Sequence, residues 1–231
     1  MPVALFAIGD LHLSFGHSKQ MDIFPGWDNY VDRLKKNWEN LVSADDTVVI
    51  VGDISWAMKL KDTKMDFNFI NNLPGEKIIL KGNHDYWWST RKKMDEYLSL
   101  NSFNSMKILF NCAYRTDKFA VCGTRGWFYD AESDEDKKIL SREIGRLEVS
   151  IDEAKKLGGE IVAFLHYPPV YGTDECTEIL NLLIYKNIKK CYYAHVHGKI
   201  AHKKAIIGEY KGINFNMVSG DYTNFTPILV K

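Results

Sequence analysis

The chain of 231 residues has only four cysteines, and none of them forms a C-x-x-C pair. A chain of this length can build a substantial hydrophobic core, and it is too large for the class of small secreted domains that depend on disulfides. We therefore expect reduced thiols and a cytoplasmic protein. The cysteines are Cys112, Cys122, Cys176 and Cys191.

An excess of charge of either sign is also absent, because Lys and Arg together number 30 and Asp and Glu together number 30. Such a chain has no overall positive field to attract nucleic acid or an anionic membrane, although a local basic patch remains an option. The composition therefore provides no strong evidence for a nucleic-acid partner.

Long hydrophobic runs are missing, since no apolar stretch approaches the ~20 residues that cross a bilayer. Met1 leads directly into the apolar run that ends at Ile8, without the basic segment of a secretory signal. We expect a strand at this position, no membrane association, and a single domain over residues 1–231.

Five short apolar runs predict buried strands, and their nearly continuous apolar character is typical of strands covered on both faces. These runs are Val3 to Ile8, Thr47 to Val51, Lys77 to Leu80, Glu160 to Leu165, and Cys191 to Ala194. Shorter patterns predict an antiparallel meander and a C-terminal hairpin. The meander comprises Met106 to Phe110, Ala113 to Thr116 and Phe119 to Gly123, and the hairpin comprises Lys203 to Tyr210 and Ile213 to Val218.

Helical periodicity occurs between these runs, over residues 30–41, about 133–158 and about 174–185. The apolar stripe of the second helix either covers a sheet or forms a dimer seam, so the oligomeric state stays open. This order of elements predicts an α/β fold in which two sheets pack face to face with helices outside.

Each of the five buried strands ends in residues that commonly bind metals. A lone histidine at a strand end is more often structural, but five of the seven histidines lie at such positions. Open α/β sheets bind ligands beyond the carboxyl ends of their strands, so we expect these side chains to converge. They are Asp10 and His12, Asp53, the run Asn83-His84-Asp85, His166, and His195 with His197.

These donors are carboxylates, imidazoles and one amide, without a thiolate. Such a set favours a hydrolytic site for manganese, iron, zinc or a similar ion over a structural zinc site rich in cysteine. The ligands are too many for one ion, whereas two ions would need a bridging carboxylate.

The ordered series D-x-H, G-D, G-N-H-D, H and H-x-H over residues 9–198 resembles the calcineurin-like metallophosphoesterase superfamily. The resemblance implies a four-layer αββα sandwich of two mixed β-sheets flanked by helices. It implies Asp10, His12 and His197 on one ion, Asn83, His166 and His195 on the other, and Asp53 bridging both. His84 is then a catalytic residue beside the phosphate, and Asp85 either orients His84 or holds the turn.

Two departures from the family pattern narrow the expected type. Ala194 replaces the glycine of the usual G-H-x-H, which keeps both ligands. The segment after Asp53 lacks the G-D-x-x-D-R-G of Ser/Thr protein phosphatases, and with it their phosphate-binding arginine. The sequence therefore resembles the small bacterial phosphohydrolases and phosphodiesterases. Arg125, between two glycines, either binds substrate phosphate or is a solvated loop arginine.

Aromatic side chains crowd the motifs, and they either pack the core or stack on a substrate. They are Trp56, Tyr86, Trp87, Trp88, Trp127 and Tyr167.

We expect a phosphoesterase with two divalent ions, manganese first and iron, zinc, nickel or cobalt as alternatives, that acts on a small phosphate ester through metal-activated water. A phosphodiester is the first choice and a nucleotide-like ester is one option. A phosphomonoesterase, a nuclease and a non-catalytic scaffold for protein partners are the alternatives.

Overall fold

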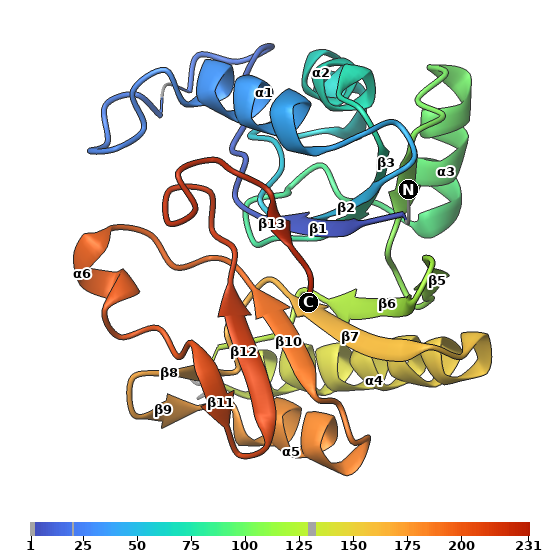
Figure 1. Cartoon of the computed structure of the whole chain (residues 1–231), viewed down its shortest axis with the longest axis vertical. Coiled ribbons are helices and arrows are strands. Elements are labelled where there is room, and N and C mark those ends of the chain that lie inside the picture. Colours follow the sequence, from blue (N-terminus) through green and yellow to red (C-terminus); the bar gives the residue numbers. More distant parts are fainter. Residues whose placement is uncertain (1–2, 20, 129–132) are drawn as a thin grey trace.

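A computed structural model describes residues 3–19, 21–128 and 133–231, and its strands form two large mixed sheets (Figure 1). The first sheet has the order β13-β1-β2-β3-β4, in which only β13 pairs antiparallel. Its strands are β1 (Leu5–Ile8), β2 (Thr47–Val51), β3 (Glu76–Leu80), β4 (Met106–Ile108) and β13 (Ile228–Leu229).

The second sheet has the order β11-β12-β10-β7-β6-β5, with antiparallel pairing only at its two edges. Its strands are β5 (Tyr114–Arg115), β6 (Phe119–Thr124), β7 (Glu160–Leu165), β10 (Lys190–Tyr193), β11 (Gly208–Tyr210) and β12 (Ile213–Met217). A separate small ribbon pairs β8 (Val170–Tyr171) with β9 (Asp174–Glu175).

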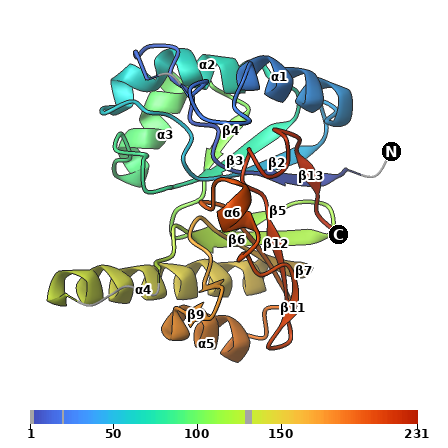
Figure 2. The same cartoon turned by 90° about the vertical axis from the view of Figure 1, so that its left-hand side faces the viewer.

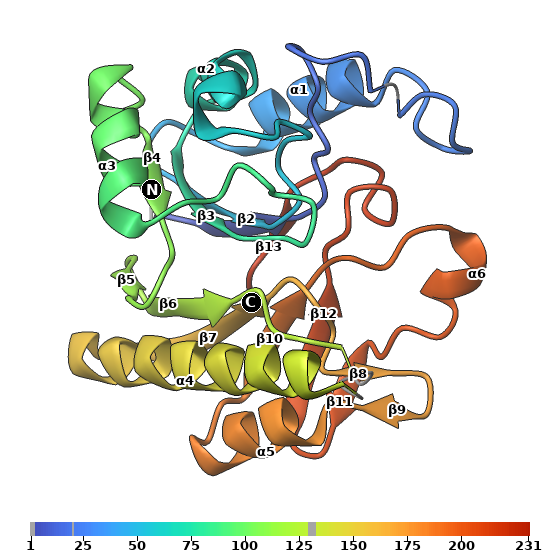
Figure 3. The same cartoon turned by 180° about the vertical axis from the view of Figure 1, so that it is seen from behind.

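Helices cover the outer faces of both sheets, as Figures 1 and 3 show from opposite sides. The first sheet carries α1 (Tyr30–Leu41), α2 (Lys64–Asn72), which follows the 3-10 turn η1 (Leu60–Thr63), and α3 (Arg91–Leu100). The second sheet carries α4 (Asp134–Leu157) and α5 (Thr177–Tyr185), while the short α6 (Lys199–His202) projects to one side. Within the described residues, every helix is too short or too polar to span a bilayer.

The core has three apolar layers, because successive residues of a strand point to opposite faces of a sheet. In β1, Phe6 and Ile8 pack under the helices of the first sheet, whereas Leu5 and Ala7 face the second sheet. In β7, Val162 lies between the two sheets and Ala163 packs toward α4 and α5. The αββα sandwich is therefore confirmed, and the sequences of these strands are apolar on both faces for this reason.

The predicted antiparallel meander is wrong. Met106–Ile108 pairs parallel with β3 in the first sheet, and β6 pairs parallel with β7, so only β5 and β6 are antiparallel neighbours. The physical reason is that α3 and α4 are crossover connections. Each returns the chain to a position beside the preceding strand, so the next strand pairs parallel with it.

Two other elements begin several residues later than the sequence predicts. The helix expected from about residue 174 begins at Thr177, because Asp174–Glu175 is the strand β9. The C-terminal hairpin is confirmed around Lys211 and Gly212, but its first strand is only Gly208–Tyr210.

Candidate metal centre

The carboxyl ends of β1, β2 and β3 in one sheet face those of β7 and β10 in the other. The loops that follow them bring seven predicted ligands together, and Figure 2 views the molecule from the side on which α6 lies next to these loops. Four of the seven residues have left-handed backbone, with φ of 57° at Asp10, 42° at His12, 51° at Asp53 and 72° at His195. Such conformations cost energy in residues other than glycine and cluster at functional sites.

Asp10, His12 and His197 form the first cluster, and their ligand atoms all lie within 4.8 Å of one another. The Nε2 atoms of His12 and His197 are 3.4 Å apart, and Asp10 Oδ1 is 3.7 Å from His197 Nε2. Two nitrogens that each lie about 2.1 Å from a shared ion are separated by about 3.0–3.5 Å. The spacing of the imidazoles therefore fits one ion.

Asp53, His166 and His195 form the second cluster, with His195 Nδ1 3.2 Å from His166 Nε2. Asn83 joins it, because its Oδ1 lies 2.7 Å from His166 Nε2. The other ring nitrogen of His166 is 3.0 Å from the carbonyl oxygen of Val51. If Nδ1 donates to that carbonyl, Nε2 presents a lone pair toward the amide oxygen, which is the arrangement that a cation stabilises.

Asp53 lies between the two clusters. Its Oδ1 accepts a hydrogen bond of 2.8 Å from the backbone N–H of His84. Its Oδ2 is 3.7 Å from His12 Nε2 and 3.6 Å from His166 Nε2, one residue from each cluster. This buried Oδ2 receives no hydrogen bond from the described residues, and neither does Asp10 Oδ1. Buried carboxylate oxygens normally have partners, so both atoms fit metal ligation.

Burial lowers the pKa of His12, of His166 to about 3 and of His195 to about 2, so these three imidazoles are neutral at physiological pH. Burial acts the same way on His197, but the carboxylates of Asp10 and Asp221 outweigh it and raise its pKa to about 9. Neutral imidazole is the form that coordinates metals. Three of the four histidines are therefore already in the ligating state.

Two glycines make this proximity possible. A Cβ on Gly82 would lie 2.1 Å from both the backbone nitrogen and Oδ1 of Asp53. Gly52 has φ of 82°, and a Cβ there would lie 2.6 Å from His166 Nδ1. Both glycines are required because the exits of β2 and β3 touch the ligands themselves.

His84 lies beside the clusters and belongs to neither of them. Its ring centroid is 4.5 Å from that of Trp56 and 5.8 Å from that of His12. Its Nδ1 is 3.3 Å from the hydroxyl of Tyr86, whose side chain is exposed. Trp56 and Tyr86 thus border the site, whereas Trp87 is buried in the core.

Asp85 is fully buried and ties two loops together. Its Oδ1 accepts hydrogen bonds from the backbone N–H of Ile54 at 2.8 Å and from the indole of Trp87 at 3.0 Å, and its Oδ2 accepts one from Gly82 N–H at 2.7 Å. These contacts agree with the turn-holding alternative for Asp85, and its part in catalysis stays a prediction.

Arg125 is only 16% exposed, so the alternative of a solvated loop arginine is wrong. Its guanidinium is 3.7 Å from the buried carboxylate of Glu143 on α4 and lies over the ring of Trp127. Its charge also contributes to the lowered pKa of His166, after burial and other charges. The backbone of Arg125 lies beside the second cluster, because its carbonyl accepts a hydrogen bond of 2.9 Å from the N–H of Tyr167, the residue after His166. The Nε of Arg125 is buried without a hydrogen-bond partner among the described residues.

The model of the family described as calcineurin-like phosphoesterase matches residues 4–199. The chain belongs to this family. Calcineurin-like phosphoesterases bind a dinuclear metal centre, and the two His/Asp clusters are candidate groups for it. Family and clusters together make this rim the candidate metal centre of the chain.

Two solved structures share this calcineurin-like fold across almost the whole chain. A protein of unknown function from Aquifex aeolicus is 14% identical with a TM-score of 0.51, and the match covers 98% of this chain and 95% of that one. The phosphopantetheinyl hydrolase of Mycobacterium tuberculosis is 14% identical with a TM-score of 0.57, over 99% and 96% of the two chains. At such identity the likeness concerns the fold alone.

A curated relative, the Gene 66 protein of Mycobacterium phage L5, is 38% identical over 79 residues. The match covers 33% of this chain and 37% of the phage protein, so this chain spans little more than a third of that relative's length.

Sequence reasoning missed Asp221, which follows β12. Its Oδ1 is 3.0 Å from His197 Nδ1, and its Oδ2 accepts a hydrogen bond from Gly198 N–H and lies 3.3 Å from His202 Nε2. A carboxylate on the far nitrogen of a metal-binding imidazole fixes the ring and strengthens it as a ligand. The signal was present, since Gly220-Asp221 repeats the Gly-Asp pattern of Asp10 and Asp53.

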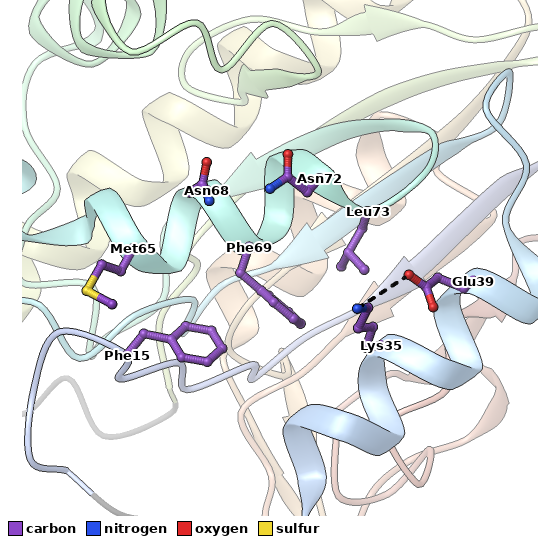
Figure 4. Close-up of a pocket in the computed structure, with 8 residues that line it drawn as sticks. All are labelled: Phe15, Lys35, Glu39, Met65, Asn68, Phe69, Asn72 and Leu73. Atoms are coloured by element: carbon purple, nitrogen blue, oxygen red, sulfur yellow. Dashed lines mark ion pairs between the residues drawn. The ribbon is translucent and has the colours of Figure 1, made fainter.

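A hollow of about 380 Å³ elsewhere lies between α1, α2 and the segment after β1 (Figure 4). It contains the ion pair of Lys35 and Glu39 and the rings of Phe15 and Phe69. None of the predicted ligands lines it, so we do not assign chemistry to it.

Asp221→Asn should weaken metal binding at the first cluster by about 10–100-fold, because His197 would lose a charged partner for its Nδ1. Calorimetric titration of the metal-free protein with Mn²⁺ measures this loss. Glu209→Gln, which changes an exposed acid, is the control and should leave the affinity unchanged. Equal affinities in both variants would remove Asp221 from this role.

Metal binding should release protons at pH 7. Without metal, burial raises the pKa of Asp10 to about 7, and nearby carboxylates raise that of His197 to about 9, so protons remain on this pair below those values. Because ligation displaces them, the apparent affinity should rise with pH by up to about tenfold per unit and proton between about pH 7 and 9. Calorimetry in buffers of different ionisation enthalpy counts the protons, and a count of zero would contradict this assignment.

Proposed function

We propose that this chain hydrolyses phosphate esters with two divalent metal ions, and that its substrates are phosphodiesters before phosphomonoesters. The observation that carries the proposal is the position of Asp53 Oδ2, which is nearly equidistant from His12 Nε2 and His166 Nε2 and has no hydrogen-bond partner among the described residues. A carboxylate held in this way suits a bridge between two ions.

In this proposal the ligands divide along the two clusters. Asp10, His12 and His197 hold one ion, Asn83, His166 and His195 hold the other, and Asp53 bridges them. When bound, the two ions supply an activated water and neutralise charge on the phosphate. Manganese is our first choice, and iron, zinc, nickel or cobalt suit the same donors.

His84 acts on the substrate directly in this proposal. It is partly exposed at the mouth of the site, outside both clusters, and the Tyr86 hydroxyl is within reach of its Nδ1. From there its Nε2 can donate a proton or a hydrogen bond to the phosphate or the leaving oxygen. Asp85 serves as a positioning residue, because its carboxylate fixes the loops that carry Asp53 and His84.

Arg125 is the proposed cation for phosphate. The protein-phosphatase arginine is missing, and Arg125 lies close enough to the second cluster to influence His166. Because Arg125 also pairs with Glu143, part of its charge is neutralised, which is one reason to prefer the singly charged diester over a monoester. A small phosphate ester in the cytoplasm remains the expected type of substrate, and a nucleotide-like ester is one option.

The scaffold alternative is weaker. A protein that had lost its chemistry would be expected to lose a ligand or His84, and this sequence keeps the residue expected at each of these positions. Strain at four ligand residues also points to a retained function.

Hydrolysis assays on the metal-loaded protein test the proposal. Bis(4-nitrophenyl) phosphate should be cleaved faster than 4-nitrophenyl phosphate.

Two variants test the roles of Asp53 and His84. Asp53→Asn should lose both ions and the activity, since it removes the shared carboxylate. His84→Ala should keep both ions and slow turnover by about 10²–10⁴. Elemental analysis of gel-filtered samples reports the metal. Full occupancy in Asp53→Asn would refute the bridge, and inactivity of the wild type on every ester would refute the function.

Arg125→Ala should lower kcat/KM, with a loss of transition-state stabilisation of about 1.5–3 kcal/mol, the scale of a charge-assisted hydrogen bond. Arg125→Lys should restore only part of this loss. The fold should persist, because Glu143 keeps its partners Thr124 and Arg146. Arg146→Ala is the matched control, since it removes the other cation on Glu143. If Arg146→Ala lowered kcat/KM equally, Arg125 would act through Glu143 and not on substrate.

A further inference from the structure

A cavity of about 710 Å³ opens directly beside the first cluster, with His197 and Asp221 in its wall. Most of its wall comes from two segments far apart in sequence, the loop before α1 and the region around α6, which Figures 1 and 2 show on the same side of the molecule. Tyr171 of β8 and Asp221 complete the wall. Cavities of this volume hold ligands of drug size, whereas a phosphate group alone is far smaller. Something larger than phosphate can therefore be accommodated next to the metal ligands.

The lining of the cavity is mainly apolar. Phe24 and Trp27 come from the loop before α1, and Ile200 comes from α6. Trp27 is buried and its ring lies 5.7 Å from that of His197, so the apolar wall begins at the ligand itself. Phe24 and Ile200 are 48% and 82% exposed, although large apolar side chains gain by burial. Their exposure beside the candidate site is consistent with a wall that an apolar ligand covers.

Two lysines complete the lining. Lys199 and Lys204 are both exposed, and within the described part of the chain neither has an ion-pair partner. The acid on this wall, Asp221, is already engaged with His197, His202 and Gly198. The cavity thus offers an apolar surface together with uncommitted positive charge, which is complementary to a group that is both apolar and anionic.

We propose that this cavity binds the organic group of the substrate, and that this group is a bulky apolar alcohol that carries a second acidic substituent. The inference rests on the proposed function, because the phosphate of the ester must sit on the metal ligands for its organic group to reach the cavity. Phe24 and Ile200 contact the apolar body, and Lys199 and Lys204 bind the acid. Esters of small polar alcohols are then poor substrates.

Phosphonates test this inference, because each carries one organic group and is stable to hydrolysis, so that binding is measured without turnover. Calorimetry on the manganese-loaded protein compares methylphosphonate, hexylphosphonate and 6-phosphonohexanoate. Hexylphosphonate should bind at least about tenfold tighter than methylphosphonate, since several methylenes leave water. The added carboxylate of 6-phosphonohexanoate should tighten binding further. Equal affinity of methyl- and hexylphosphonate would overturn the inference and leave the metal centre standing.

Variants assign the effect to the cavity. Ile200→Ala and Phe24→Ala should reduce the hexyl-to-methyl affinity ratio about 3–10-fold, and Lys199→Ala with Lys204→Ala should remove the advantage of the carboxylate. Leu100→Ala is the control, because Leu100 is 85% exposed at the end of α3 and outside the cavity. An unchanged ratio in the cavity variants would overturn the inference. If none of the phosphonates bound and no ester were cleaved, the proposed function would fall together with it.

Discussion

The hydrogen bond from the His84 amide to Asp53 Oδ1 is the contact on which the rest of the site depends. It orients the Asp53 carboxylate, so that Oδ2 is left facing both clusters. The tie is reciprocal, because Asp85, in the same loop as His84, accepts hydrogen bonds from Ile54 and Ser55 in the Asp53 loop. The exits of β2 and β3 therefore form one rigid unit.

Electrostatics gives this unit its chemical character. Burial raises the pKa of Asp53 to about 6, although the amide of His84 opposes the shift, and burial lowers the pKa values of His12 and His166. The buried rim thus contains carboxylates that resist ionisation and two imidazoles, those of His12 and His166, that resist protonation. Each of these pKa shifts reflects the cost of an isolated charge at the rim. Divalent cations would remove that cost for the carboxylates and use the neutral imidazoles as they are. Metal binding should thus also stabilise the fold.

Much of this rim could be predicted from the sequence, because ligand positions depend on local patterns. An apolar run followed by Gly-Asp or by histidine marks a buried parallel strand and its exit, as at Asp53 and His166. Asp221 was missed because its strand was assigned only to a hairpin, whereas β12 also pairs parallel with β10 and so ends at the same rim. The contact of Arg125 with Glu143 was beyond sequence reasoning, since Glu143 lies on a helix whose packing decides the contact.

Each cluster takes residues from both sheets, so the candidate metal centre also connects the two sheets. Hydrogen bonds at the rim also connect the two sheets: Gly9 N–H donates to Val218 O at 2.7 Å, and His195 N–H donates to Asp10 Oδ2 at 2.9 Å.

The family glycine is replaced by Ala194 here. The methyl of Ala194 fills the space where a side chain on Gly9 would lie, 2.5 Å away. The close approach of the sheets is therefore maintained by Gly9 on one side while Ala194 fills the other. Because the predicted ligands Asp10 and His195 directly follow these two residues, the distance between the sheets sets the distance between these two side chains. The apolar layer between the sheets therefore helps to set the geometry of the candidate metal site.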